Sequence, residues 1–240
     1  MLCVLYGYRR TIPGNRAELF EACVDALLFR WDTFRSVDRD PLVSVPIAPD
    51  RKKLLLSRVA YRAFDRDITF FKKDNLRDLI EAELNYLDLS NISPDKLLRE
   101  IESHNGLLIE YAPEVYRFSH LTFHEFFTAL YYHDTKEYPE LFHKAVREPR
   151  YMEVFLMCVE KMYNADQMMM NLISYIKNQC FTKTADNPIY HRYEHSLVNS
   201  VLHCDIAMNH KLRAVLEEMN IRLEQMSIND QSVSYIDDRS

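Results

Sequence analysis

Apolar side chains recur with a helical period along most of the chain. Between Ala17 and Trp31 they return every three or four residues, and Pro13 and Gly14 interrupt any helix that precedes them. This stripe predicts an amphipathic helix. The same pattern predicts helices over residues 54–64, 75–87, 139–147, 150–163, 166–180, 189–205 and 207–226. The chain is therefore expected to be mostly α-helical.

One region departs from this pattern. Ser93 is a good N-cap, Pro94 suits a first helical turn, and Gly106 is a typical C-cap, so a further helix is expected between them. Two short apolar runs, 107–111 and 115–118, then flank a proline-containing turn, as in a β-hairpin. Two helices followed by a hairpin are the order of a winged-helix domain.

Glycine is scarce, with three residues in the whole chain. Because glycine supplies the left-handed turns of hairpins and phosphate loops, its scarcity also favours a mostly-α fold. The phosphate-loop pattern G-x-x-x-x-G-K-[ST] is absent, and so is G-x-G-x-x-G. No pairing of nucleophile and base stands out either. We therefore expect no enzyme activity and no catalytic residue in this chain.

The most informative stretch is residues 118–130, which read F-S-H-L-T-F-H-E-F-F-T-A-L. They resemble the signature F-x-H-x-x-x-Q-E-F/Y-F-A-A, which ends the winged-helix domain of NACHT-type STAND NTPases. This family of signal-transduction ATPases includes animal inflammasome receptors, the NLR proteins, and bacterial anti-phage sensors. Residues 12–32, I-P-G-N-R-A-E-L-F-E-A-C-V-D-A-L-L-F-R-W-D, resemble a block of the small helical domain that follows the ATPase core. With E-P-R-Y-M-E-V in the second half, the resemblance covers about Met1 to Glu160.

The resemblance implies the C-terminal part of such an NTPase, which we expect to be bacterial, without the Walker A and B core. The core, and a segment close to the nucleotide, would precede Met1. The implied domains are a remnant of the small helical domain (1–64), a winged-helix domain with a small β-hairpin (65–130), a second helical domain built as a bundle or array (131–226) and a flexible tail (227–240).

The implied function is regulatory and autoinhibitory. In the family these domains hold the ATPase core closed while ADP is bound, and they swing away on activation. The resemblance also implies a role in anti-phage or innate immune defence. The expected partner is that ATPase core, in cis or in trans, and the activated parent would form an oligomer. ADP or ATP belongs to the parent architecture, and no cofactor is expected for this chain alone.

His120 is the candidate cofactor-binding residue. Thr122 and Glu125 have the spacing of a capping box, so Thr122 is expected to cap a helix and His120 to lie on the turn before it. A helix N-terminus favours phosphate through its unpaired N–H groups and its dipole. Spacing alone favours a local backbone role for the histidine. In the family, the matching histidine contacts the β-phosphate of ADP, so His120 is a phosphate sensor only if an ATPase core is present.

Two groups of residues that include histidines are candidates for a metal site. His124 stands where the family has Gln, four residues from His120, but the predicted cap argues against one continuous helix with both ligands on one face. A second group would need its helix to fold back, and it more simply lines a helix pair. No metal site is therefore predicted. The second group consists of His191, His195, His203 and Cys204.

Charge and cysteine content bear on partners and compartment. The net charge is −6, and residues 75–125 hold ten acidic and four basic residues, which disfavours the alternative of a winged-helix regulator that binds nucleic acid. A helical adaptor that binds other proteins remains a second alternative. No secretory signal or membrane span is recognisable, so we expect a cytoplasmic protein without membrane contact. The cysteines are expected to be reduced thiols: Cys3, Cys23, Cys158, Cys180 and Cys204.

Overall fold

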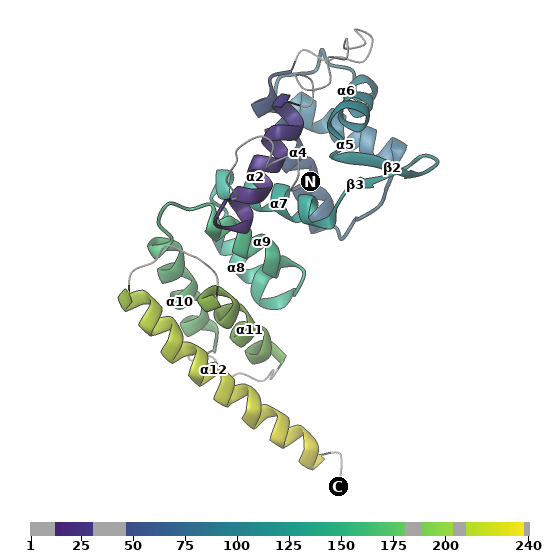
Figure 1. Ribbon diagram of the computed structural model, residues 1–240. Helices are drawn as coiled ribbons and strands as arrows, with labels where there is room; N and C mark the ends of the chain where they lie inside the picture. Colours follow the sequence, from purple (N-terminus) through teal and green to yellow (C-terminus); the bar gives the residue numbers. More distant parts are fainter. Residues whose placement is uncertain (1–12, 31–46, 181–188, 204–209, 238–240) are drawn as a thin grey trace. The chain divides into compact units, whose positions relative to one another are not determined.

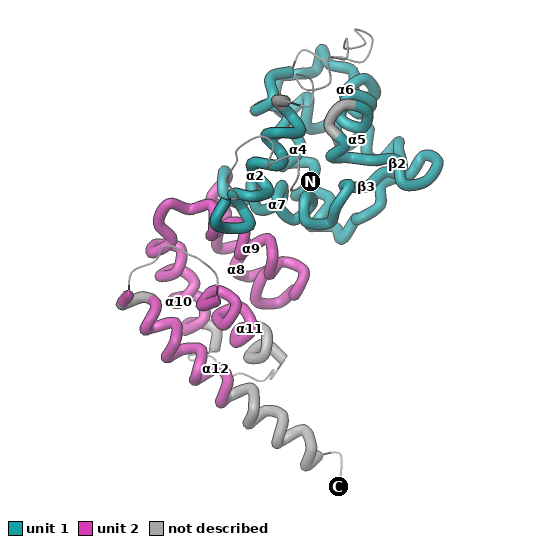
Figure 2. The backbone as a smooth tube through the Cα atoms, viewed as in Figure 1, with its two compact units in different colours: residues 1–134 teal, residues 135–240 magenta. Residues whose placement is uncertain are grey.

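The computed structural model of the protein describes residues 13–30, 47–180, 189–203 and 210–237 (Figure 1). The chain divides into two compact units, Met1–Asp134 and Thr135–Ser240 (Figure 2). The division lies close to the end of the winged-helix domain expected from the sequence at residue 130. The predictions for residues 1–12 and for Trp31 fall outside the described residues.

Among the helices of these described ranges, none combines the length and the apolar character needed to cross a bilayer.

Unit 1 begins with a helix whose start was predicted from the sequence. Helix α2 spans Arg16–Asp25, and the π-helical turn η1 (Ala26–Arg30) continues it. The side chain of Asn15 accepts the backbone N–H of Glu18 at 2.8 Å, which caps the helix. The apolar stripe faces inward, because Ala17 and Val24 have no exposed surface.

The rest of unit 1 is a winged helix. A three-stranded antiparallel sheet has the order β1-β3-β2, so the first strand pairs with the last. Three helices precede the hairpin and one follows it, which confirms the predicted fold class. The elements are α4 (Pro49–Asp65), β1 (Phe71–Lys72), α5 (Lys73–Tyr86), α6 (Pro94–Glu100), η2 (Ile101–Asn105), β2 (Leu108–Ala112), β3 (Val115–Phe118) and α7 (Leu121–Thr135).

The predicted start of the winged-helix domain at residue 65 stays a prediction. In the structure, helix α4, which precedes this residue, packs against α5 as the first helix of the motif. Leu55 and Leu56 of this helix are fully buried. The helix also starts earlier than the predicted residue 54, because Pro49 occupies its first turn, where a missing N–H costs nothing.

The third helix of the motif is α6 together with its continuation η2. Its two ends lie where Ser93 and Gly106 predict them. The Ser93 hydroxyl accepts the N–H of Lys96 at 3.5 Å, a long bond. At the other end Gly106 adopts φ of 60°, and its N–H donates to the Ile101 carbonyl at 2.9 Å. A residue with a Cβ would be strained at this left-handed position, which explains the glycine.

A buried ion pair joins the first and third helices of the motif. The Lys52 ammonium contacts the Glu100 carboxylate, and the two residues are only 5% and 2% exposed. Burying either charge alone would be costly, so each requires the other. The pair therefore fixes α6 against α4 across a long separation in sequence.

Unit 2 contains the predicted helices of the second half. They are α8 (Tyr138–Arg147), α9 (Tyr151–Glu160), α10 (Asp166–Cys180), α11 (Ile189–His203) and α12 (His210–Asp237). Helix α11 packs along α12, while α8 contacts α9, α10 and α11. The flexible tail expected at 227–240 stays a prediction, and in the structure α12 continues to Asp237. The stretch loses its apolar period but contains neither glycine nor proline, so no residue in it stops the helix.

Two of the five cysteines are described together with their side chains. Cys23 in α2 and Cys158 in α9 are both buried, free thiols. Burial raises the pKa of the Cys23 thiol, which keeps it protonated and unreactive near neutral pH. The predictions for the remaining cysteines concern side chains outside the described residues: Cys3, Cys180 and Cys204.

Candidate functional site

His120 lies on the short connection between the wing, which is the hairpin of β2 and β3, and helix α7. Strand β3 ends at Phe118, the Ser119 N–H donates to the Leu107 carbonyl at 2.9 Å, and α7 begins at Leu121. His120 directly precedes this first helical residue and is exposed. It therefore occupies the position at the helix N-terminus that the sequence led us to expect.

The predicted capping box needs correction. Thr122 was expected to be the N-cap, but it is already the second residue of α7. The carbonyl of His120 accepts the N–H of Phe123 at 3.1 Å, so the first turn forms around the histidine. The His120 ring contacts the Phe123 ring edge-on, with centroids 6.2 Å apart. One side of the imidazole thus rests on the helix, while the exposed side is available to a ligand.

Aromatic packing holds this connection in place. The Phe123 ring meets Phe20 of α2 in a T-shaped contact at 5.8 Å, and Phe126 lies 6.4 Å from the same ring. Phe118 at the end of β3 packs on Phe127 at 5.9 Å. Because Phe123, Phe126 and Phe127 are fully buried, the start of α7 is fixed against both α2 and the wing.

His124 belongs to this core and does not share a ligand site with His120. Its side chain is 2% exposed, and Nε2–H donates to the carbonyl of Ala60 in α4 at 3.0 Å. The ring stacks on Phe118 at 4.8 Å and meets Phe64 edge-on at 5.1 Å. The residue that departs from the family signature therefore has a structural role, joining α7 to α4.

The second histidine group is only partly described. The ring of His203 lies with Nδ1 2.7 Å from the carbonyl of Asn199, and His195 is half-buried. The side chains of His191 and Cys204 lie outside the described residues. Within the described ranges, no three or more side chains of the types that bind metals gather in one place.

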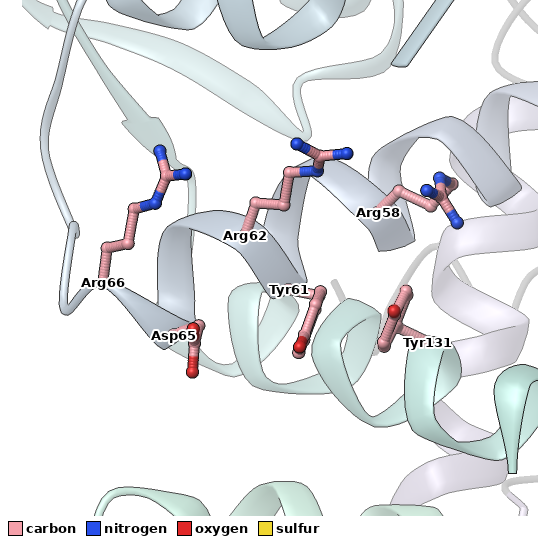
Figure 3. A pocket seen from close by; sticks show the side chains of 6 residues that line it. All are labelled: Arg58, Tyr61, Arg62, Asp65, Arg66 and Tyr131. Carbon is pink, nitrogen blue, oxygen red and sulfur yellow. The ribbon is translucent and has the colours of Figure 1, made fainter. Parts of the chain in front are cut away.

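The structure also contains a pocket that the sequence did not reveal. It has a volume of about 260 Å³ and lies in unit 1 between α4 and α7 (Figure 3). No site is predicted here from the sequence, although the arginines at every fourth position between residues 58 and 66 are a detectable signal. Its lining residues are Arg58, Tyr61, Arg62, Asp65, Arg66 and Tyr131.

One wall of this pocket consists of arginines held by a buried carboxylate. Glu83 of α5 has no exposed surface; it accepts a hydrogen bond from Arg58 Nε and forms an ion pair with Arg62 Nε outside hydrogen-bond geometry. The Arg58 guanidinium also lies 3.7 Å from the centre of the Tyr86 ring. One carboxylate, that of Glu83, thus orients both the Arg58 and the Arg62 guanidinium. These three side chains together have a net charge of +1.

The other wall is aromatic. The rings of Tyr61 and Tyr131 stack nearly in parallel, with centroids 3.8 Å apart and planes 5° apart. Tyr132, which is fully buried, contacts the Tyr61 ring edge-on at 5.4 Å. The stacked pair joins α4 to the C-terminal half of α7 and makes this wall rigid.

Comparison with known proteins identifies the domain that carries both features. A family model described as a winged helix-turn-helix domain C-terminal to NACHT matches residues 16–132. The match spans α2 and the whole winged helix, and it includes His120 and every residue of the pocket. No curated protein and no solved structure matches the chain.

Proposed function

Residues 16–132 of this chain belong to the family of winged helix-turn-helix domains C-terminal to NACHT, and we propose from this that the chain is a regulatory module of a NACHT-type NTPase. The module holds the ATPase core closed while ADP is bound and releases it on activation. Such a hinge is a two-state element that the bound nucleotide biases. The family match is the observation that carries this proposal.

The position of His120 supports the nucleotide-sensing part of the proposal. The residue is exposed and directly precedes α7, where N–H groups of the first helical turn and the helix dipole favour an anion. A ring N–H can donate a hydrogen bond to a phosphate oxygen. Because Phe123 and its neighbours fix the start of the helix, the imidazole is already positioned before the nucleotide arrives.

Charge on the third helix of the motif argues against the alternative of nucleic-acid binding. Glu100 is buried against Lys52, and the charged residues left at the helix surface are two acids and two bases. A helix that reads DNA needs an excess of Lys and Arg to contact phosphates. The surface residues are Asp95, Lys96, Arg99 and Glu102.

The proposal extends to partners, cofactor and setting. The partner is a NACHT ATPase core, in cis or in trans, and ADP or ATP is bound by that core together with His120. The chain is not catalytic by itself, since its sequence contains no phosphate-loop motif. Oligomer formation by the activated parent, a role in anti-phage or innate immune defence, and a cytoplasmic location rest on the family resemblance.

Nucleotide retention tests the proposal. The chain is purified together with its ATPase core, as the natural polypeptide or as a co-expressed partner, and bound nucleotide is extracted and quantified. One hydrogen bond to a charged group is worth about 1.5 kcal/mol or more, so His120→Ala should weaken ADP binding at least about tenfold. His210→Ala, at an exposed histidine of unit 2, is the matched control. Equal ADP affinity in both variants would refute the role of His120.

A further inference from the structure

The pocket between α4 and α7 has the composition of an anion site. Arg58 and Arg62 lie four residues apart on α4, Arg66 follows directly after the end of this helix, and all three line the pocket (Figure 3). Residues four apart lie one above another on a helix face. The lining of a single pocket therefore includes three arginine side chains.

Most hydrogen-bonding capacity of these arginines is unused. Arg58 and Arg62 contact Glu83 through Nε, and no hydrogen bond or ion pair within the described part of the chain involves the Arg66 guanidinium. The terminal nitrogens of all three likewise donate to no group in the described residues. Each guanidinium can thus offer its two terminal NH2 groups, with four N–H donors, to a ligand.

The balance of charge is also positive. Three arginines face two carboxylates, Glu83 beneath them and Asp65 on the rim, so the site has a net charge of about +1 in a chain whose net charge is −6. Glu83 is fully buried, so a ligand meets the guanidinium groups rather than this carboxylate. The stacked rings of Tyr61 and Tyr131 also line the pocket.

We propose that this pocket binds the phosphoryl group of a small phosphorylated molecule. Planar guanidinium forks match the oxygens of phosphoryl groups in pairs, and such charge-assisted hydrogen bonds are the strong ones. A carboxylate has two oxygens, whereas a phosphoryl group has three and carries nearly twice the charge at pH 7. A lining with more guanidinium groups than carboxylates therefore suits a phosphoryl group better.

The size of the pocket limits the ligand. A volume of about 260 Å³ accommodates more than an isolated phosphate, yet it lies just below the range of about 300–1,000 Å³ typical for small-molecule sites. The rings of Tyr61 and Tyr131 supply a surface for the organic part of the ligand. His120 does not line this pocket, so the site is separate from the proposed nucleotide sensor and does not depend on an ATPase core.

Phenyl phosphate is a suitable probe, because it combines a phosphoryl group with an aromatic ring of small size. We would titrate it into the purified 240-residue chain at low salt and follow the arginine Nε–H signals by NMR. Signals of Arg62 and Arg66 should shift in a saturable manner. Those of Arg77, which pairs with Asp78 on α5 outside the pocket, should not.

Arg66→Gln is the informative variant. Arg66 is exposed and supports no buried carboxylate, so its replacement leaves the fold intact, unlike changes at Arg58 or Arg62. It should weaken phenyl phosphate binding about tenfold through the loss of one charge-assisted pair. Arg77→Gln, the matched control for loss of one positive charge, should leave the affinity unchanged.

Three results would overturn the proposal. The first is the absence of saturable shifts with phenyl phosphate. The second is an equal loss of affinity in Arg66→Gln and Arg77→Gln, which would indicate only a diffuse effect of net charge. The third is benzoate binding as tightly as phenyl phosphate, which would show that the site does not select a phosphoryl group.

Discussion

Replacement of His124 tests whether this residue joins α7 to α4. In His124→Ala the hydrogen bond to Ala60 is lost, at about 1 kcal/mol, since the carbonyl lies inside a helix and retains its helical partner. The ring also fills core space against Phe118 and Phe64, and truncation of a buried aromatic ring typically costs about 3–5 kcal/mol. Because the imidazole ring is smaller than a phenyl ring, the lower end of that range applies, and we expect unit 1 to lose about 4 kcal/mol of unfolding free energy in total.

His124→Gln is the matched control. A glutamine amide can still donate to the Ala60 carbonyl, so this variant should lose only the ring contacts, about 1 kcal/mol. Urea unfolding followed by circular dichroism gives the free energies, and hydrogen exchange at amides of α4 and α7 assigns the loss to unit 1. An alanine variant that loses less than about 1 kcal/mol would refute the burial of the ring. Equal losses in both variants would refute the role of the hydrogen bond.

Three further predictions follow from single features. Lys52→Met leaves the buried Glu100 carboxylate without its ammonium partner and should lower the unfolding free energy, measured in urea, by about 3–5 kcal/mol. Adding Glu100→Leu should recover most of this loss, and a loss below about 1 kcal/mol in Lys52→Met would contradict the pairing. Gly106→Ala should cost about 1–2 kcal/mol from left-handed backbone strain alone, since an added Cβ meets no atom within 4 Å; unchanged stability would show that the turn rearranges. Loss of solvation, and secondly the Arg147 cation, lower the pKa of His143 below its ordinary value of 6.5, so the folded state favours the neutral ring and protonation opposes folding below that pH. NMR titration of His143 should show a midpoint below 6.5 that rises in Arg147→Gln. A midpoint above 6.5 in the unchanged chain would contradict this.

Local signals in the sequence predicted the local parts of the fold. Ser93, Pro94 and Gly106 mark the ends of one helix through interactions within a few residues, and the structure keeps all three in those roles. The apolar period gave helices α8, α10 and α11 nearly at their observed bounds, since packing of one face decides them. Where a few neighbouring residues determine the local structure, sequence patterns are sufficient to predict where a helix begins and ends.

Features that depend on distant partners were missed. Strand β1 has two residues and exists only because Phe71 and Lys72 pair with β3, far along the chain. The partner of His124 is a carbonyl 64 residues away, so the sequence suggested only a metal pair with His120, which the predicted cap disfavoured, and not a core hydrogen bond. The capping box failed for a related reason, because packing of Phe123 against α2 places the first turn of α7 one residue earlier than Thr122.

Of the two candidate sites, the one with a local sequence signature could be predicted, and the one built from distant residues could not. His120 could be found because a short signature carries it, and the structure places it at the expected helix end. The arginine pocket requires Glu83 from another helix and Tyr131 from the end of α7, and no local spacing brings these together. Its trace in the sequence is the four-residue spacing of the arginines between residues 58 and 66.

The central claim is that this chain regulates a NACHT-type ATPase core. The most direct measurement is peptide mass spectrometry of the native complex that carries residues 1–240 in source cells. The account predicts peptides of a Walker-type ATPase core in stoichiometric amount, either in the same polypeptide or in a stably bound partner. Recovery of the chain alone, or with partners that contain no such core, would contradict it.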